Sequence, residues 1–214
     1  MSEDTGDFTP KAKDLPIDQE VSKTVRHEWD LEVLTEEMIQ AQELPESNKE
    51  LATGVAELVR KETGSQLGEW NLRAPLTAAA LATVVHELVQ NLVKDAVLDE
   101  FGKASSAASL TLEFEPDDGR QVGRLRLQTE QERSVDASVK ERILEGIAAA
   151  KSGDPLAAFS LVNEEGTLGG LGIFVLTGLT IRSGGDLSVS FPDNKPKFEI
   201  SFDSEGKPQK TTGS

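Results

Sequence analysis

The clearest pattern along the chain is an apolar stripe between residues 75 and 95. Its members recur at intervals of four, three and four residues: Leu81, Val85, Leu88 and Leu92. This is the spacing of one face of an α-helix. Pro75 suits the first helical turn, because the N–H group that proline lacks has no intrahelical partner there. The pattern predicts one long helix over residues 75–95.

The region before this helix is also predicted to be helical. Its apolar residues fall at helical spacing in two runs, with a break near Trp29: Ile17, Val21 and Val25, then Leu31, Leu34 and Met38. Ser47 and Glu50 form an S-x-x-E capping box, which starts a second helix. The spacing therefore predicts a helical hairpin over residues 17–70, preceded by a disordered tail over residues 1–16.

After residue 107 the hydrophobic period changes from helical to alternating. Apolar and polar residues alternate over residues 110–114, 125–127, 187–191 and 198–202, which predicts four half-buried strands. Val139, Ile143 and Ile147 predict a short helix between the second and third strands. Helices on one face of a mostly antiparallel sheet give an α+β two-layer sandwich. Residues 206–214 are polar and are predicted to form a disordered tail.

Composition restricts the classes of function. The 214 residues carry a formal net charge of −16, which argues against nucleic acid or an anionic membrane as a partner. There is no cysteine, so disulfides, thiolate nucleophiles and cysteine zinc sites are excluded, and two histidines are too few for a histidine-rich metal site. No apolar run approaches the ~20 residues of a membrane span. The acidic N-terminus is unlike a signal peptide, so we expect a cytoplasmic protein.

Two stretches carry candidate chemistry. Glu87 and Asn91 lie four residues apart and therefore stack on one side of the predicted helix, at the edge of its apolar stripe. The second stretch, GTLGGLGIFVLTGLTIRSGG at 166–185, opens with four glycines: Gly166, Gly169, Gly170 and Gly172. Glycines before a helix let backbone N–H groups approach a phosphate, and the helix N-terminus adds partial positive charge. The simpler interpretations are a solvated helix edge and a tight loop.

Taken in this order, HELVQN and GGLGIFVLTGL…RSGGDLSV resemble the ATP-binding domain of the GHKL superfamily, which includes histidine kinases, gyrase B, the mismatch-repair ATPase and anti-sigma kinases. The resemblance implies a histidine kinase-like ATPase fold over residues 71–205, with ATP and Mg²⁺ as cofactors. It implies that Asn91 coordinates Mg²⁺, that Glu87 orients or deprotonates the attacking group, and that Lys94 neutralises a phosphate oxygen. The glycines, Gly172 among them, would fold over the triphosphate. A signalling protein capable of phosphoryl transfer to histidine or serine follows from the resemblance.

The sequence departs from this family at the Asp-x-Gly motif, in which the aspartate accepts the adenine amino group. Thr129 stands about where the aspartate belongs, and no glycine follows it. Glu130, Glu132 and Asp136 are alternative acceptors. Losing a buried acceptor costs about 1–3 kcal/mol, or roughly one to two decades in affinity. The alternative function is therefore a degenerate relative that binds no ATP and works as a histidine phosphotransferase or docking scaffold.

His27 is the candidate phosphoacceptor for this alternative. It lies in the predicted helical hairpin and is followed by Glu28. This arrangement resembles that of histidine kinases and histidine phosphotransferases, which carry the phospho-accepting histidine on an antiparallel helical hairpin, often followed by an acidic residue. The simpler interpretation is a surface histidine without a role, and no role is assigned to His86. The expected partners are a response regulator or another regulatory protein, and a second copy of the chain in a homodimer.

Overall fold

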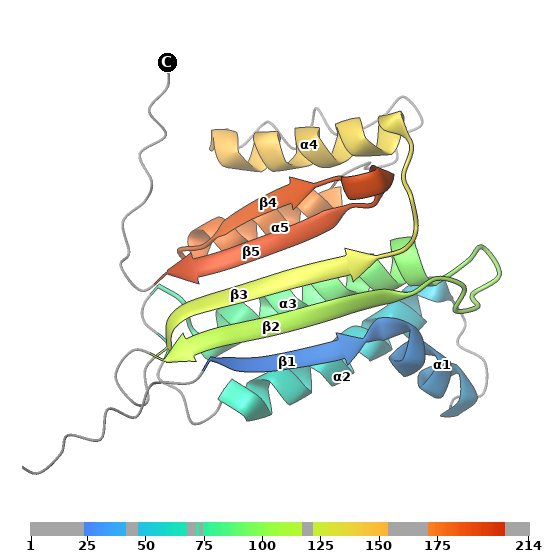
Figure 1. Ribbon diagram of the computed structural model, residues 1–214, viewed down its shortest axis with the longest axis horizontal. Helices are drawn as coiled ribbons and strands as arrows, with labels where there is room; N and C mark the ends of the chain where they lie inside the picture. Colours follow the sequence, from blue (N-terminus) through green and yellow to red (C-terminus); the bar gives the residue numbers. More distant parts are fainter. Residues whose placement is uncertain are drawn as a thin grey trace, which may run out of the picture.

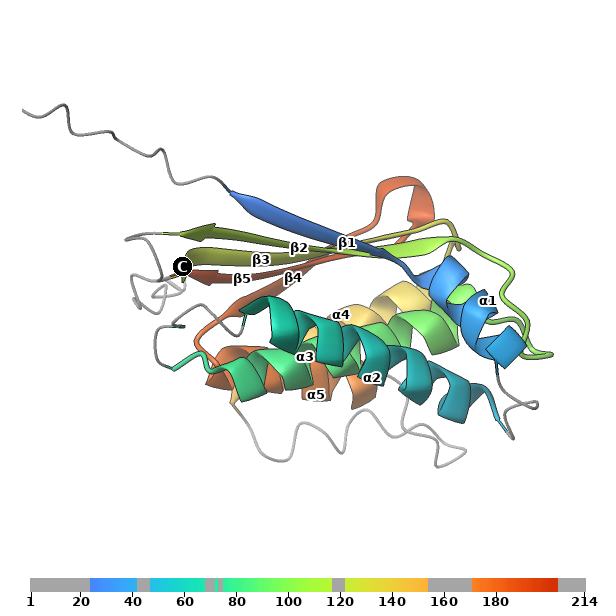
Figure 2. The same ribbon diagram turned by 90° about the horizontal axis from the view of Figure 1, so that it is seen from below.

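Five antiparallel strands form one sheet, and helices cover one of its faces (Figures 1 and 2). The structure is a computed structural model, and it describes residues 24–41, 47–67, 72, 75–116, 122–153 and 171–203. The predicted α+β two-layer sandwich is confirmed. Both predicted tails lie outside the described residues.

The sheet brings together strands from both ends of the chain. Side by side, they are β1 (Val25–Asp30), β2 (Ala108–Pro116), β3 (Val122–Gln131), β5 (Lys197–Asp203) and β4 (Asp186–Ser190). Each pair of neighbours is antiparallel. Successive side chains of a strand point to opposite faces, so the alternating pattern gives the sheet one apolar and one polar face. Leu127, opposite Leu112 and Ile200, lies at the centre of the apolar face and is fully buried.

The polar face of the sheet carries ion pairs between neighbouring strands. Arg126 Nε lies 3.2 Å from Glu199 Oε1, and Lys197 Nζ lies 2.7 Å from Glu130 Oε1. Figure 2 shows that α2, α3, α4 and α5 all lie on the other side of the sheet. Within the part of the chain that the structure describes, this face is therefore open.

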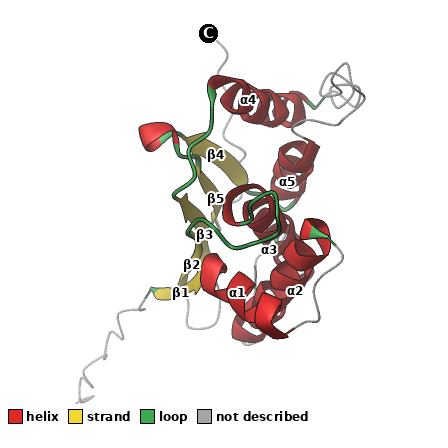
Figure 3. Cartoon of the chain, turned by 90° about the vertical axis from the view of Figure 1, so that its right-hand side faces the viewer, coloured by secondary structure: helices red, strands yellow, loops and turns green. Residues whose placement is uncertain are grey.

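The helical layer is built around the predicted apolar stripe. Figure 3 shows its helices beside the sheet: α2 (Asn48–Leu67), α3 (Ala78–Leu92), α4 (Ala137–Ser152) and α5 (Leu171–Arg182), with α1 (Leu31–Ala41) at one end. All four stripe residues of α3 are buried, which confirms the central helix. Its start is three residues later than Pro75, and after Leu92 the chain continues as a π-helical turn, Val93–Val97. None of the described helices is both long enough and apolar enough to cross a bilayer.

Thr77 determines where α3 begins. Its hydroxyl oxygen accepts the backbone N–H of Ala80 at 3.1 Å and so satisfies a donor that has no intrahelical partner. Thr77→Ala is expected to lower the free energy of unfolding by about 1 kcal/mol in urea denaturation. Thr83→Ala is the matched control on the same helix, because its hydroxyl only donates to the Ala79 carbonyl and is exposed. Equal losses in the two variants would contradict the capping role.

The predicted helical hairpin over residues 17–70 is wrong for residues 25–30, which form β1. Val25, His27 and Trp29 alternate with exposed charged residues, so the period in this segment is two rather than that of a helix. Strand β1 pairs with β2, with Trp29 opposite Leu110, and the indole Nε1 donates to Glu62 Oε2 of α2 at 2.6 Å. The helical pattern begins only at Leu31, and α1 and α2 are the two helices that the sequence predicted there.

Candidate functional site

Asn91 of α3 and Gly172 in the first turn of α5 lie against each other. A Cβ atom placed on Gly172 would lie 2.7 Å from Asn91 Oδ1 and 3.2 Å from its Nδ2. Real Cβ atoms do not approach a neighbour that closely, so the residue at position 172 must lack a side chain for the amide to remain in place. The amide and one glycine of the predicted phosphate loop therefore meet at the N-terminus of α5.

The Asn91 amide has a donor without a partner among the described residues. Its Nδ2 is buried, and no acceptor in the described part of the chain forms a hydrogen bond with it. A buried donor without an acceptor costs about 1–3 kcal/mol, so it is a group for which a partner is expected. An oxyanion beside the helix N-terminus would supply an acceptor, and Oδ1 is a hard oxygen of the kind that Mg²⁺ binds. The residues at this junction thus fit a phosphate group with its metal ion.

Glu87 and Lys94 flank Asn91 along the same helical segment. Glu87 lies one turn before Asn91 on α3 and is half-buried. Lys94 lies in the π-helical turn, 55% exposed, with its Nζ 3.5 Å from Asp95 Oδ1. Gly166, Gly169 and Gly170 lie outside the described residues, so of the glycines in the predicted loop only Gly172 can be placed.

Thr129 is fully buried and takes part in the sheet. Its hydroxyl oxygen accepts the backbone N–H of Phe198 at 3.0 Å, one residue beyond the last main-chain pair of β3 and β5. Threonine has no carboxylate, and its hydroxyl oxygen already accepts a main-chain N–H, so this residue does not supply the adenine acceptor that the family resemblance requires there.

The alternative acceptors have other partners. The hydrogen bond and charge of Lys197 lower the pKa of Glu130, and Asp136 caps α4 by accepting the N–H of Val139 at 2.8 Å. That bond, together with the Ser138 hydroxyl, lowers the pKa of Asp136. Glu132 is exposed.

The two histidines occupy different environments. His27 lies on β1 rather than on a helix, half-buried, with its ring stacked at 6.3 Å from Trp29 and 5.9 Å from Phe114. Its location on a helical hairpin, which motivated the phosphoacceptor hypothesis, is therefore wrong. His86 of α3 is 18% exposed, and its Nδ1 lies 3.5 Å from Glu57 Oε1 of α2. This pair was not predicted, because nothing in the sequence sets the packing of α2 against α3.

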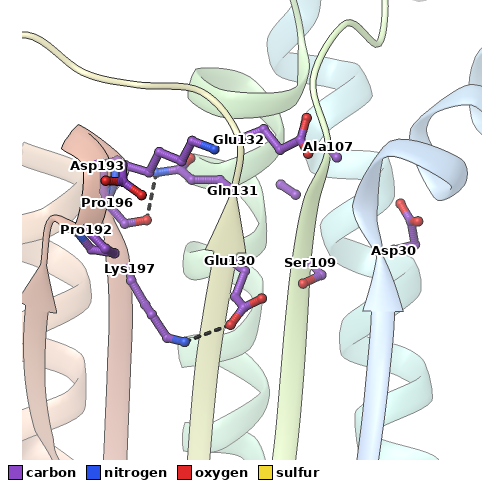
Figure 4. A pocket seen from close by; sticks show the side chains of 12 residues that line it. Asp30, Ala107, Ser109, Glu130, Gln131, Glu132, Pro192, Asp193, Pro196 and Lys197 are labelled. Carbon is purple, nitrogen blue, oxygen red and sulfur yellow. Dashed lines mark hydrogen bonds and ion pairs between the residues drawn. The ribbon is translucent and has the colours of Figure 1, made fainter.

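A hollow lies on the polar face of the sheet, away from Asn91, at the end where β3 stops (Figure 4). Its volume is about 420 Å³. Its charged lining comes from β1, β3, β5 and the connections that follow β3 and β4: Asp30, Glu130, Glu132, Asp193, Lys195 and Lys197. Sequence reasoning missed it, because these residues meet only once the strands have paired. Among the described residues no group of three or more histidine, aspartate or glutamate side chains could hold a metal ion.

Comparison with known proteins finds distant likenesses among solved structures. No protein-family model matches this chain, and no curated protein sequence is significantly similar to it. Among solved structures, the chain is similar to the histidine kinase domain of the blue-light activated histidine kinase from Erythrobacter litoralis EL346. The two are 14% identical, the match covers 80% of this chain and 70% of that one, and the TM-score is 0.37. A likeness this distant bears on the fold at most.

Proposed function

We propose that this chain is a kinase-like signalling protein that binds the phosphates of a nucleotide, with Mg²⁺, between α3 and the N-terminus of α5. The observation that supports the proposal best is the Asn91 amide, which lies against Gly172 and whose buried Nδ2 has no partner among the residues that the structure describes. Two segments that are far apart in the sequence thus place a polar group and a helix N-terminus side by side.

Each described residue would contribute a specific interaction. Asn91 Oδ1 would coordinate Mg²⁺, which keeps several waters and so needs few protein ligands, and Nδ2 would donate to a phosphate oxygen. The N–H groups of the first turn of α5 would donate to the same phosphates. Glu87 would orient the attacking group one turn away, and Lys94 would exchange Asp95 for a phosphate oxygen. Mg²⁺ would supply charge neutralisation, and phosphoryl transfer needs mainly such positioning and charge stabilisation.

Calorimetric titration of the full chain with ATP and MgCl₂ tests the proposal. We expect Mg²⁺-dependent binding, and we expect Asn91→Ala to lose about 1.5–3 kcal/mol of binding free energy, since hydrogen bonds to charged groups are worth about that much. Gln90→Ala is the matched control, because this neighbouring amide faces α2 and donates to Thr53 Oγ1 at 2.6 Å. Absence of heat at millimolar nucleotide, with the protein folded, would rule the proposal out.

A second candidate is a relative that binds no nucleotide and works as a docking scaffold or histidine phosphotransferase, with a response regulator or other regulatory protein, or a second copy, as partner. The buried Thr129 hydroxyl, committed to Phe198, favours it. Incubation with a phosphorylated response regulator tests the phosphotransfer version. Transfer of labelled phosphate to the wild-type chain but not to His27→Gln supports phosphotransfer. If neither chain is labelled, the docking version of this candidate remains.

A further inference from the structure

Phe101 is the most exposed large apolar side chain among the described residues. It is 78% exposed and lies in the connection between the π-helical turn and β2. Figure 1 shows this connection projecting from the end of the sheet where β3 stops. A phenylalanine displayed in water loses the free energy that burial would give it, about 1.5–3 kcal/mol for a side chain of this kind. A partner that covers the ring would recover that free energy.

The loop that displays Phe101 is held by several hydrogen bonds. Asp99 Oδ1 accepts the backbone N–H groups of Phe101 and Lys103, both at 2.9 Å, and the Asp99 N–H donates to the Lys103 carbonyl at 2.9 Å. Asn48 of α2 donates its Nδ2 to the Asp99 carbonyl at 3.0 Å. Gly102 has a φ of +75°, and a Cβ there would lie 2.7 Å from Asn48 Oδ1. The ring is therefore presented on a preorganised loop, which reduces the entropy lost when a partner binds.

The acidic hollow lies at the same end of the sheet as this loop. Ala107 lines the hollow, and its carbonyl accepts the N–H of Glu132 at 2.9 Å, while Arg133 Nη1 donates to the Leu98 carbonyl at 3.0 Å. The segment that carries Phe101 is thus bonded to the segment that forms one wall of the hollow. Figure 4 shows Ala107 and Glu132 together on that wall.

The charge around the hollow indicates which partner fits it. Its lining holds more carboxylates than ammonium groups, and Lys197 is already paired with Glu130. The other charged residues of the lining are three carboxylates, Asp30, Glu132 and Asp193, and one ammonium group, Lys195. The whole chain carries a formal net charge of −16, so it attracts a cationic partner and repels a second copy of itself.

We propose that the Phe101 loop and the adjacent hollow form a docking surface for a basic segment of another protein, in which an apolar side chain covers the Phe101 ring and an arginine or lysine enters the hollow. The hollow lies on the polar side of the sheet, and the Phe101 loop projects from the same end of the sheet beside α2, to which Asn48 Nδ2 bonds it. The proposal is independent of nucleotide binding at Asn91.

A short dye-labelled peptide that alternates arginine and leucine serves as the probe, with full-length protein and fluorescence polarisation as the readout. We expect saturable binding that weakens with added salt. Phe101→Ser is expected to weaken binding about tenfold or more, as for an aromatic anchor, and Asp193→Asn to weaken it to a smaller extent. Leu144→Ser is the matched control, because Leu144 is also exposed, at 51%, but lies on α4.

Three outcomes would overturn the proposal. Equal binding of a peptide with glutamate in place of arginine would show that charge plays no part. Unchanged binding by Phe101→Ser, with the variant shown to be folded by its thermal unfolding, would place the peptide elsewhere. Self-association that Phe101→Ser abolishes, without peptide binding, would assign the surface to a second copy of the chain instead.

Discussion

Leu127→Ala is expected to lower the free energy of unfolding by about 2–5 kcal/mol. Leu127 is fully buried at the middle of β3, and it lies between Leu112 of β2 and Ile200 of β5 on the face that packs against the helices. Truncation removes apolar contacts and leaves a cavity that paired strands on both sides cannot close. Urea denaturation followed by circular dichroism measures the loss, which is a large fraction of the stability of an ordinary domain.

Arg126→Ala is the matched control for this prediction. Arg126 is the preceding residue of the same strand, its side chain is 40% exposed on the polar face, and its Nε lies 3.2 Å from Glu199 Oε1. Because such exposed ion pairs contribute about 0–1 kcal/mol, a small loss is expected. If Arg126→Ala were as damaging as Leu127→Ala, the assignment of the two faces of the sheet would be wrong.

Hydrophobic period alone was enough to predict the elements that bury one clean face. In α3 the stripe through Leu88 and Leu92 is buried throughout, and in β2 and β3 the alternating leucines all point to the core. In such elements each local preference agrees with the final packing, so pattern and structure coincide.

The same method failed at β1 because the segment is short and bears two compatible patterns. Val21 and Val25 are four residues apart, as in a helix, while Val25, His27 and Trp29 are two apart, as in a strand. The pairing with β2 decides between them, and β2 begins far along the chain at Ala108. Information of that range is absent from a local window, so tertiary contact overrides the helical pattern.

The candidate site was only partly predictable for a related reason. The proximity of Asn91 and Gly172 followed from a resemblance between two motifs, and the structure brings these two residues together. The buried Thr129 hydroxyl and the pair of His86 with Glu57 depend on which strand or helix lies alongside, and no spacing within one segment encodes that.

Asn91→Leu is expected to raise the free energy of unfolding by about 1 kcal/mol, the low end of the cost of an unsatisfied buried donor, and to abolish stabilisation by nucleotide. The buried Nδ2 has no partner in the described structure, and removing an unsatisfied donor in favour of an apolar group of similar shape is neutral or stabilising. The same change removes the amide that lies against Gly172, so the proposed phosphate and Mg²⁺ contacts are lost. Opposite signs for stability and binding are typical of a residue retained for function.

Thermal unfolding with and without ATP and MgCl₂ separates the two effects. A ligand that binds the folded state stabilises it in proportion to RT ln(1 + [L]/Kd), so the wild type should gain stability on addition and Asn91→Leu should not. Gln90→Leu is the control: it breaks the 2.6 Å bond to Thr53 Oγ1, so it should lose stability in the absence of ligand while it keeps the gain on addition. A marked loss of stability in Asn91→Leu would mean that the amide serves the packing of α3 against α5, and the case for a phosphate site at that junction would lose its main support.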